Sequence, residues 1–169
     1  MGITKQEVQE WIEFLYNDLC MDNVLIGGYY FNLQQEDELK QINQKINKQI
    51  NDILDDITKL STVNKKTASA DAQSAHNKLS NQLDKLQIKL KVKNKFGENI
   101  TVPCTPEEFN VVYKEFKSRL LDVKHFRQNA LEELKSVKSK DISCFMWFLN
   151  DSVDDIREKF AGRQYNLVV

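Results

Sequence analysis

Apolar residues recur at helical spacing along most of this chain, and segment 39–60 carries the clearest pattern. Its apolar residues are Leu39, Ile42, Ile46, Ile50, Ile53, Ile57 and Leu60. The steps between them are three or four residues, the spacing of a left-handed supercoil. Polar residues fill the remaining positions, so the apolar stripe is narrow. The pattern predicts a helix over 33–60 that pairs with another helix, of this chain or of another.

Local start signals place two further helices. Thr4 followed by Glu7 forms a capping box ahead of apolar residues at helical spacing, which predicts a first helix over 4–22. The stretch TPEE at 105–108 combines a capping threonine, a proline suited to the first helical turn and a second capping box. It predicts that a long helix begins there and covers 106–138.

Spacing alone indicates two more helices. Leu79, Leu83 and Leu86 continue a stripe that predicts a helix over 67–90, and a last apolar stripe predicts one over 141–161. The whole chain holds only five glycines and two prolines. So few helix breakers favour long helices.

Segment 88–104 changes to strict alternation of apolar and polar residues. Its alternating apolar residues are Ile88, Leu90, Val92, Ile100, Val102 and Cys104. Two alternating runs around a turn that contains Gly and Asn predict a β-hairpin. Pro103 cannot donate a hydrogen bond to a neighbouring strand, so we expect its strand to lie at a sheet edge or to end there.

The run VLIGGYYF at 24–31 does not resolve into one element. Gly27 and Gly28 weaken a helix, and they mark either a bend or a close contact between helices. Because the pair follows no predicted strand, we do not interpret it as a phosphate-binding loop.

Together these elements predict a mainly α protein: an elongated antiparallel coiled coil or helical bundle with a small β-hairpin insert over 88–104, in a single domain. We expect helix 67–90 to pair with helix 106–138, with the 39–60 helix alongside. The apolar helices at both ends of the chain are expected to pack near them.

Composition excludes several classes of function. The chain has 169 residues, 41% apolar and 29% charged, with a formal net charge of −1. Such a balance gives no overall field that would attract nucleic acid. The longest apolar run, 24–31, is too short to span a membrane. No cleavable signal is visible, so a cytoplasmic protein is the default, and export by a signal-less route stays open.

No catalytic, cofactor-binding or metal-binding residues are predicted. His76 and His125 have no metal ligands at suitable spacing, and the carboxylate clusters at 52–56 and 151–155 are interpreted as solvated helix surface. The three cysteines are far apart in the sequence and are interpreted as small buried apolar residues.

A local basic strip stands out in segment 85–95. Its lysines are Lys85, Lys89, Lys91, Lys93 and Lys95. Two interpretations remain: the strip contacts phosphate, acidic protein or lipid headgroups, or it keeps an exposed strand edge from pairing with other chains. The second is favoured.

Two apolar-aromatic runs are candidates for partner binding, because the helical stripes alone cannot cover them. The candidate residues are Tyr29, Tyr30, Phe31, Phe145, Met146, Trp147 and Phe148. The alternative is that both runs lie in the core.

Four features resemble one family when taken together: the apolar-aromatic run 24–33, the polar helix 39–60, the stretch GENITVPCTPEEF at 97–109, and the short C-terminal helix. In this pattern, over most of its length, the chain resembles the hydrophilic translocators of type III secretion systems, the needle-tip and filament proteins. The resemblance implies a component or substrate of a bacterial secretion apparatus.

We therefore expect a non-enzymatic protein that binds other proteins or self-associates through its helices, with no nucleic acid and no membrane span. The alternative is a chaperone or immunity-type protein that masks a single partner.

Overall fold

The computed structural model describes residues 2–62, 70–94 and 96–162. Within them the chain is mainly α with a small antiparallel sheet, which confirms the prediction of a mainly α fold. The helices are α1 Lys5–Met21, α2 Glu36–Thr62, α3 Ala70–Asp84, α4 Pro106–Ser136 and α5 Ile142–Gly162. The strands are β1 Asn23–Ile26, β2 Tyr29–Asn32, β3 Ile88–Lys93 and β4 Asn99–Cys104, and short 3-10 turns occupy Leu33–Gln35 and Ser139–Asp141.

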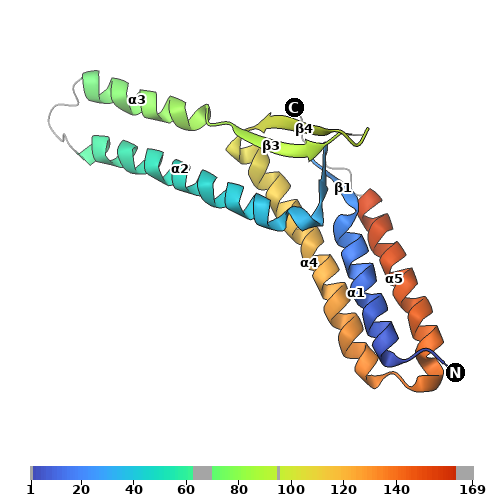
Figure 1. The fold of residues 1–169 in the computed structure, drawn as a ribbon. Helices are drawn as coiled ribbons and strands as arrows, with labels where there is room; N and C mark the ends of the chain where they lie inside the picture. Colours follow the sequence, from blue (N-terminus) through green and yellow to red (C-terminus); the bar gives the residue numbers. More distant parts are fainter. Residues whose placement is uncertain (1, 63–69, 95, 163–169) are drawn as a thin grey trace.

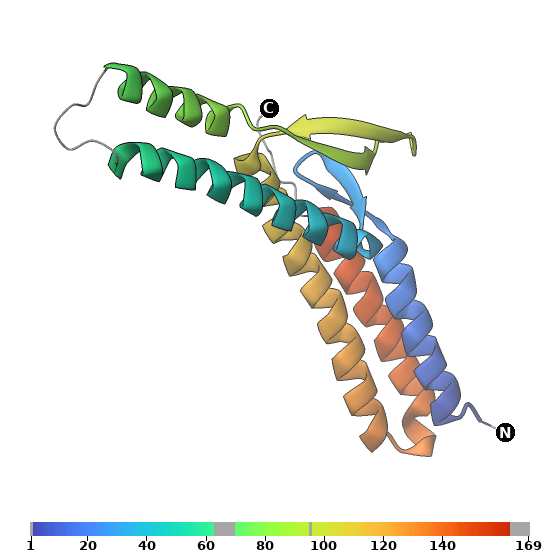
Figure 2. The same ribbon diagram turned by 60° about the vertical axis from the view of Figure 1, so that its left-hand side comes forward.

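Two helical arms diverge from the sheet (Figures 1 and 2). Helices α1, α4 and α5 form one arm, which we call the bundle, and α2 with α3 form the other, which we call the helical hairpin. In the bundle α4 runs antiparallel to both α1 and α5, as the colours in Figure 1 show. The sheet lies where the two arms meet.

The core of the bundle is made by broad apolar faces. Ile12 of α1, Phe116 and Val123 of α4, and Leu149 of α5 are each at most 1% exposed. Each residue lies on a face whose neighbours three or four positions away are also buried, as in helices that contact partners on two sides. Three helices around one centre leave little of these faces in water.

Side-chain caps fix where α1 and α4 begin, with the predicted capping box at α1 and the threonine cap without the reciprocal glutamate bond at α4. Thr4 Oγ1 accepts a hydrogen bond from the Glu7 backbone N–H at 3.2 Å, and the Glu7 carboxylate accepts one from the Thr4 N–H at 3.2 Å. Thr105 Oγ1 accepts from the Glu108 N–H at 3.2 Å, and Pro106 occupies the first turn of α4. Each cap satisfies backbone donors that have no partner inside the helix.

The sheet contains a β-hairpin that sequence reasoning missed. Strands β1 and β2 pair antiparallel, with Ile26 opposite Tyr29. Gly27 and Gly28 form the turn between them with φ angles of 58° and 85°. Positive φ at both central residues is what a type I′ turn requires, and glycine adopts it without a steric penalty. The prediction that this pair follows no strand was therefore wrong, although the glycines lead into a strand and not into a helix N-terminus.

The predicted β-hairpin over 88–104 is confirmed. Strand β3 pairs with β4 from Ile88 opposite Cys104 to Lys93 opposite Asn99. The sheet order is β1-β2-β3-β4, so Pro103 lies in an edge strand, as predicted. Strand β3 is internal, joined to β2 where Tyr30 pairs with Lys93.

The predicted pairing of segment 67–90 with segment 106–138 was wrong. Helix α3 packs against α2, and the long α4 packs mainly against α1 and α5. The reason lies in the width of the stripes: α4 has a broad aromatic face that needs neighbours on two sides, whereas α2 and α3 have narrow stripes that suit each other. The first residues predicted for the third helix, 67–69, lie outside the described residues.

Candidate functional site

Burial along α2 falls with distance from the sheet. Leu39 is 2% exposed and Ile46 is 5% exposed, whereas Ile50, Ile53 and Ile57 are only half-buried. All five belong to the single apolar stripe that predicts this helix. The stripe is thus buried as far as Ile46, Ile50 still packs partly against the core, and Ile53 and Ile57 beyond it stay half-buried.

Helix α3 provides the other side of this contact, and it is thinly apolar. Ala75, His76, Leu79 and Leu83 are all half-buried. Among the side chains described in 47–59 and 73–87, none is buried. We call the half-buried residues Ile50, Ile53, Ile57, Leu79 and Leu83 the hairpin seam.

The inner end of the helical hairpin is attached to the bundle. Lys124 of α4 donates hydrogen bonds to both carboxylate oxygens of Glu36 at 3.1 and 3.2 Å. Gln35 Nε2 donates to the Lys91 carbonyl on β3 at 3.4 Å, a long and weak contact. These contacts hold the start of α2 against α4 and the sheet, and the hairpin seam lies beyond them.

The structure separates the candidate partner-binding residues of the 24–31 run. Phe31 is fully buried, with its ring centroid 6.5 Å from that of Phe116, so it belongs to the core. Tyr29 and Tyr30 are half-exposed on the same strand. Tyr29 meets Phe31 edge to face at 6.5 Å. Only the two tyrosines remain accessible to a partner.

The candidates of the last helix divide in the same way. Phe145 is 8% exposed and Met146 is half-buried, but Trp147 is 74% exposed and Phe148 is 55% exposed. Large aromatic side chains this exposed are uncommon on a helix that is otherwise well packed. Trp147 and Phe148 therefore form a second accessible apolar surface, on the bundle.

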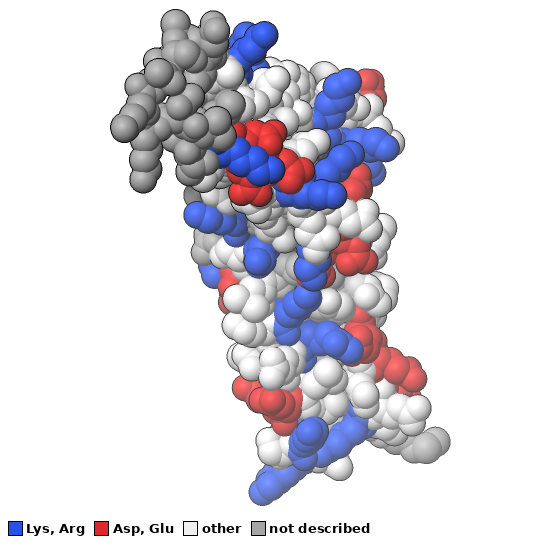
Figure 3. Space-filling view, turned by 90° about the vertical axis from the view of Figure 1, so that its left-hand side faces the viewer, with Lys and Arg blue, Asp and Glu red and all other residues white. Residues whose placement is uncertain are grey.

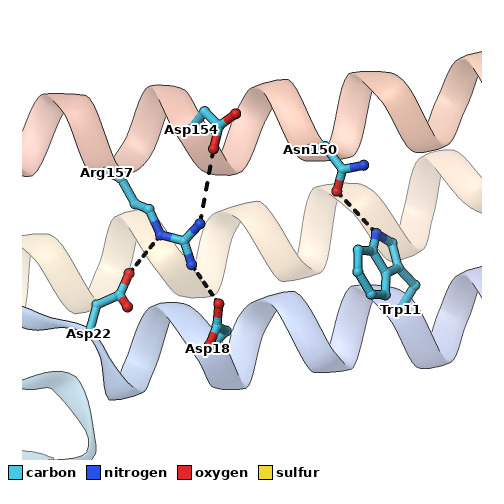
Figure 4. Close-up of polar contacts among 6 residues, drawn as sticks. All are labelled: Trp11, Asp18, Asp22, Asn150, Asp154 and Arg157. Atoms are coloured by element: carbon cyan, nitrogen blue, oxygen red, sulfur yellow. Dashed lines mark hydrogen bonds and ion pairs between the residues drawn. The ribbon is translucent and has the colours of Figure 1, made fainter.

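Polar contacts fix α5 beside α1 (Figure 4). Arg157 donates to Asp22 at 2.7 Å and to Asp18 at 2.6 Å, and Trp11 Nε1 donates to Asn150 at 3.2 Å. The hydrogen bond to Asp22 raises the pKa of Arg157 above its ordinary value, and desolvation partly opposes it. The bundle thus has specific ties between its helices besides its core.

A buried arginine in the bundle was missed by sequence reasoning. Arg119 is 0% exposed, its Nε lies 3.2 Å from a Glu115 carboxylate oxygen, and its guanidinium carbon lies 5.3 Å from the Phe160 ring centroid. The sequence signal was available: Arg119 stands three residues after Phe116 and four before Val123, on the apolar face of α4.

Two of the three cysteines are buried, as predicted. Burial raises the pKa of the Cys104 thiol to about 11 and also raises the pKa of Cys20. Cys144 is exposed on α5, so the prediction was wrong for that residue. The two buried thiols remain protonated at neutral pH, a state in which thiols are poor nucleophiles.

Strand β3 is internal in the sheet order, but its register with β2 is a single pair, Tyr30 opposite Lys93, so the favoured interpretation that the lysines keep a strand edge from pairing stays a prediction. Lys89 and Lys91 point to the exposed face of β3, and Lys93 is half-exposed. Lys95 lies outside the described residues. Figure 3 views the molecule from the outer end of the helical hairpin, and on that face basic and acidic side chains are interspersed. The interpretation that the strip contacts phosphate or acidic groups stays a prediction.

In the described ranges, no group of three or more His, Cys, Asp and Glu side chains could hold a metal ion. Over the same ranges, none of the helices combines the length and apolar character needed to cross a bilayer. His125 is exposed on α4, and the clusters at 52–56 and 151–155 have exposed carboxylates.

Comparisons with protein families, with curated proteins and with solved structures found no significant match. The function must therefore be argued from the geometry of this chain.

Proposed function

We propose that this chain is a non-enzymatic protein-interaction or structural protein whose helical hairpin takes up further helices. The observation that carries the proposal is the hairpin seam, an apolar stripe with no buried residue among the side chains described in 47–59 and 73–87. The bundle buries its equivalent faces within one chain, and the helical hairpin does not.

The energetics favour a partner on the hairpin seam. Fully burying an isoleucine or leucine side chain stabilises a protein by about 1.5–3 kcal/mol relative to leaving it exposed. Half-buried side chains realise only part of that gain. Two helices with one narrow seam are marginal in water, because most helical stability in proteins comes from packing an apolar face. A further helix along Ile50, Ile53 and Ile57 would supply the missing contact.

A site-specific photo-cross-linker tests this proposal in the native cells of the protein. Placed at Ile53, it should give a protein–protein adduct, because Ile53 belongs to the hairpin seam. Asn51 is the matched control: it stands two residues earlier, on the opposite face of the helix, and is exposed. Equal cross-linking from both positions, or none from Ile53, would count against a partner on the seam.

A more specific version places the protein in a bacterial secretion apparatus, as a component or a substrate. Its support is the resemblance of segments 24–33, 39–60 and 97–109 to hydrophilic translocators. The test is to look for the chain in the culture medium of native cells with and without a working type III apparatus. Retention of the chain in the cytoplasm under both conditions would rule out a role in the secretion apparatus.

The alternative function is the masking of one partner by a chaperone or immunity-type protein. One observation favours it: Trp147 and Phe148 are exposed on the bundle, away from the hairpin seam. A masking protein should form a stoichiometric complex that is lost on Trp147→Ser and kept on Ile53→Ser. The opposite sensitivity supports the helical hairpin as the interaction site.

A further inference from the structure

We propose that the solvent-facing side of the sheet binds single-stranded nucleic acid. Side chains alternate between the two faces of a strand, and one face of this sheet lies in the core, where Val24, Phe31 and Leu90 are at most 5% exposed. The residues that alternate with them form the other face, which we call the outer face. It is a different surface from the hairpin seam, so this inference does not depend on the proposed function.

One row of residues on the outer face crosses all four strands. Leu25 pairs with Tyr30, Tyr30 pairs with Lys93, and Lys93 pairs with Asn99. Because residues directly opposite each other in a sheet project to the same face, an aromatic ring, an ammonium group and an amide lie side by side. Tyr30 is only half-buried, so part of its ring is accessible to a flat ligand such as a base.

The charges on the four strands are all basic. Their sequences contain Lys89, Lys91 and Lys93 and no Asp or Glu. The three lysines are alternate residues of β3, so they start about 7 Å apart along the strand. Among the described residues, none of the three forms an ion pair. Evenly spaced cations suit the evenly spaced phosphates of a nucleic acid strand.

This attraction is local. The expectation of no nucleic acid came from the net charge of the whole chain, which is −1. A net charge describes the field at a distance, whereas a strand lying on the sheet meets the outer face alone, because salt screens charges beyond about 10 Å.

A hollow of about 470 Å³ lies beside the lysines, between the two β-hairpins. The Gln35 side chain bridges the hairpins there: its Oε1 accepts from the Asn32 N–H at 2.9 Å and its Nε2 donates to the Lys91 carbonyl at 3.4 Å. Amide and hydroxyl groups line the hollow, from Asn23, Asn32, Gln35, Asn99 and Thr101. Such groups donate to and accept from base edges and sugar hydroxyls. Glu38 adds a carboxylate to the lining, so we expect the phosphates along the lysines and a base in the hollow.

The polarity of the outer face favours nucleic acid over two other anionic partners. Membrane-binding surfaces insert apolar side chains among the lipids, and the outer face offers the half-buried Leu25 and the exposed Pro103 for this purpose. An acidic peptide would pair with the lysines, but it has no bases to stack on Tyr30 or to bond with the amides of the hollow.

Fluorescence anisotropy of labelled oligothymidylate, mixed with the full chain at low ionic strength, tests the proposal through two matched variants that each lose three positive charges. The outer-face variant carries Lys89→Gln, Lys91→Gln and Lys93→Gln, and the control carries Lys40→Gln, Lys45→Gln and Lys48→Gln at exposed positions of α2. The outer-face variant should bind about tenfold or more weakly, and the control should bind like the unaltered chain. Each phosphate neutralised on a single strand contributes about 0.7 to the slope of log affinity against log salt, so the outer-face variant should flatten that slope by about 2.

Substitutions of Tyr30 test the stacking contact separately from the charges. Tyr30→Leu should weaken binding about fivefold to a hundredfold and leave the salt slope unchanged, because stacking on a base is not ionic. Tyr30→Phe keeps the ring and should bind like the unaltered chain. Circular dichroism checks that each variant is folded. A Tyr30→Leu variant that is folded and binds normally would overturn the assignment of this face to bases.

Three further results would overturn the inference. The first is that the unaltered chain does not bind the oligonucleotide at low ionic strength. The second is that the outer-face variant and the control lose affinity equally, which would mean that only the total charge matters. The third is that phosphatidylserine vesicles or polyglutamate compete as strongly as unlabelled oligonucleotide, which would assign the outer face to a lipid surface or to an acidic protein.

Discussion

The two arms differ in how completely their helices bury their apolar faces. In the bundle, Ile12, Phe116 and Val123 are 0% exposed. In the helical hairpin, Ile53 and Leu79 lie on the apolar stripes of their helices and are only half-buried. The difference follows from the number of neighbours, since a helix contacted on two sides can bury a broad face. Two helices with narrow stripes therefore leave part of their apolar surface uncovered.

This comparison separates stability from interaction. The bundle and the sheet hold the core that folds the chain, and specific ties such as Arg157 to Asp18 and Asp22 fix their geometry. Helix α2 adds Leu39 and Ile46 to that core, but the hairpin seam beyond them is only half-buried. We infer that substitutions in the bundle act mainly on folding and substitutions in the hairpin seam mainly on association.

The largest contrast is expected from one side chain removed from each arm. Ile12→Ala should lower the free energy of unfolding by about 2–5 kcal/mol, because it leaves a cavity in a fully packed core. Ile53→Ala should cost less than about 1.5 kcal/mol in the monomer, because part of that side chain is already in water. Urea unfolding of dilute protein measures both. Equal losses would mean that the two arms are equally packed.

A smaller effect is expected at the buried ion pair of the bundle. Glu115→Gln removes the negative charge beside the buried Arg119 and should cost about 1–3 kcal/mol. The control is Glu36→Gln at the inner end of the helical hairpin, where the pair with Lys124 is about as exposed as a surface ion pair, with side chains 36% and 45% exposed. Such pairs contribute about 1 kcal/mol or less. A control that costs as much as Glu115→Gln would contradict the assigned difference in burial.

The turn at the joint between the arms should tolerate change less well than an unconstrained position. Gly28 has a φ of 85°, so Gly28→Ala should cost about 1–2 kcal/mol even though no atom lies within 4 Å of an added Cβ. Gly2→Ala, where an added Cβ also meets nothing within 4 Å, is the control and should leave the thermal melting temperature unchanged. A Gly28 variant that melts like the control would argue against a strained turn.

The smallest effects concern the cysteines. At pH 8, Cys144 should react with iodoacetamide quickly, and Cys104 should react only when the chain opens, because its folded pKa is about 11. The raised pKa also makes stability depend on pH. The Cys104 thiol loses its proton at a lower pH in the unfolded chain than in the folded one, so the free energy of unfolding falls as pH rises from about 9 to 11. Mass spectrometry after short labelling gives the order of reaction, and rapid labelling of Cys104 in the folded protein would contradict its burial.

Local signals made part of this fold readable in the sequence. The caps at Thr4 and Thr105 and the alternation in 88–104 depend on neighbouring residues, and the structure contains each of them. The strands at 23–26 and 29–32 could not be read in this way. They have four residues each, and they complete a sheet only through contact with β3, which is distant in the sequence.

Partner choice and exposure could not be predicted either, because both depend on tertiary contacts. A narrow stripe shows that a helix needs a neighbour but not which one, so helix 67–90 was assigned to α4 when it packs on α2. The aromatic candidates illustrate the same limit. Phe31 and Trp147 both lie in apolar runs, yet one is 0% and the other 74% exposed.

Hydrogen–deuterium exchange in dilute protein tests most directly the claim that the bundle is complete within one chain and the helical hairpin is not. The account predicts that amides along the hairpin seam in α2 and α3 exchange quickly in dilute protein. Those in the buried parts of α1, α4 and α5 should be protected. If the amides along the hairpin seam are as protected as those of the bundle, the central claim is contradicted.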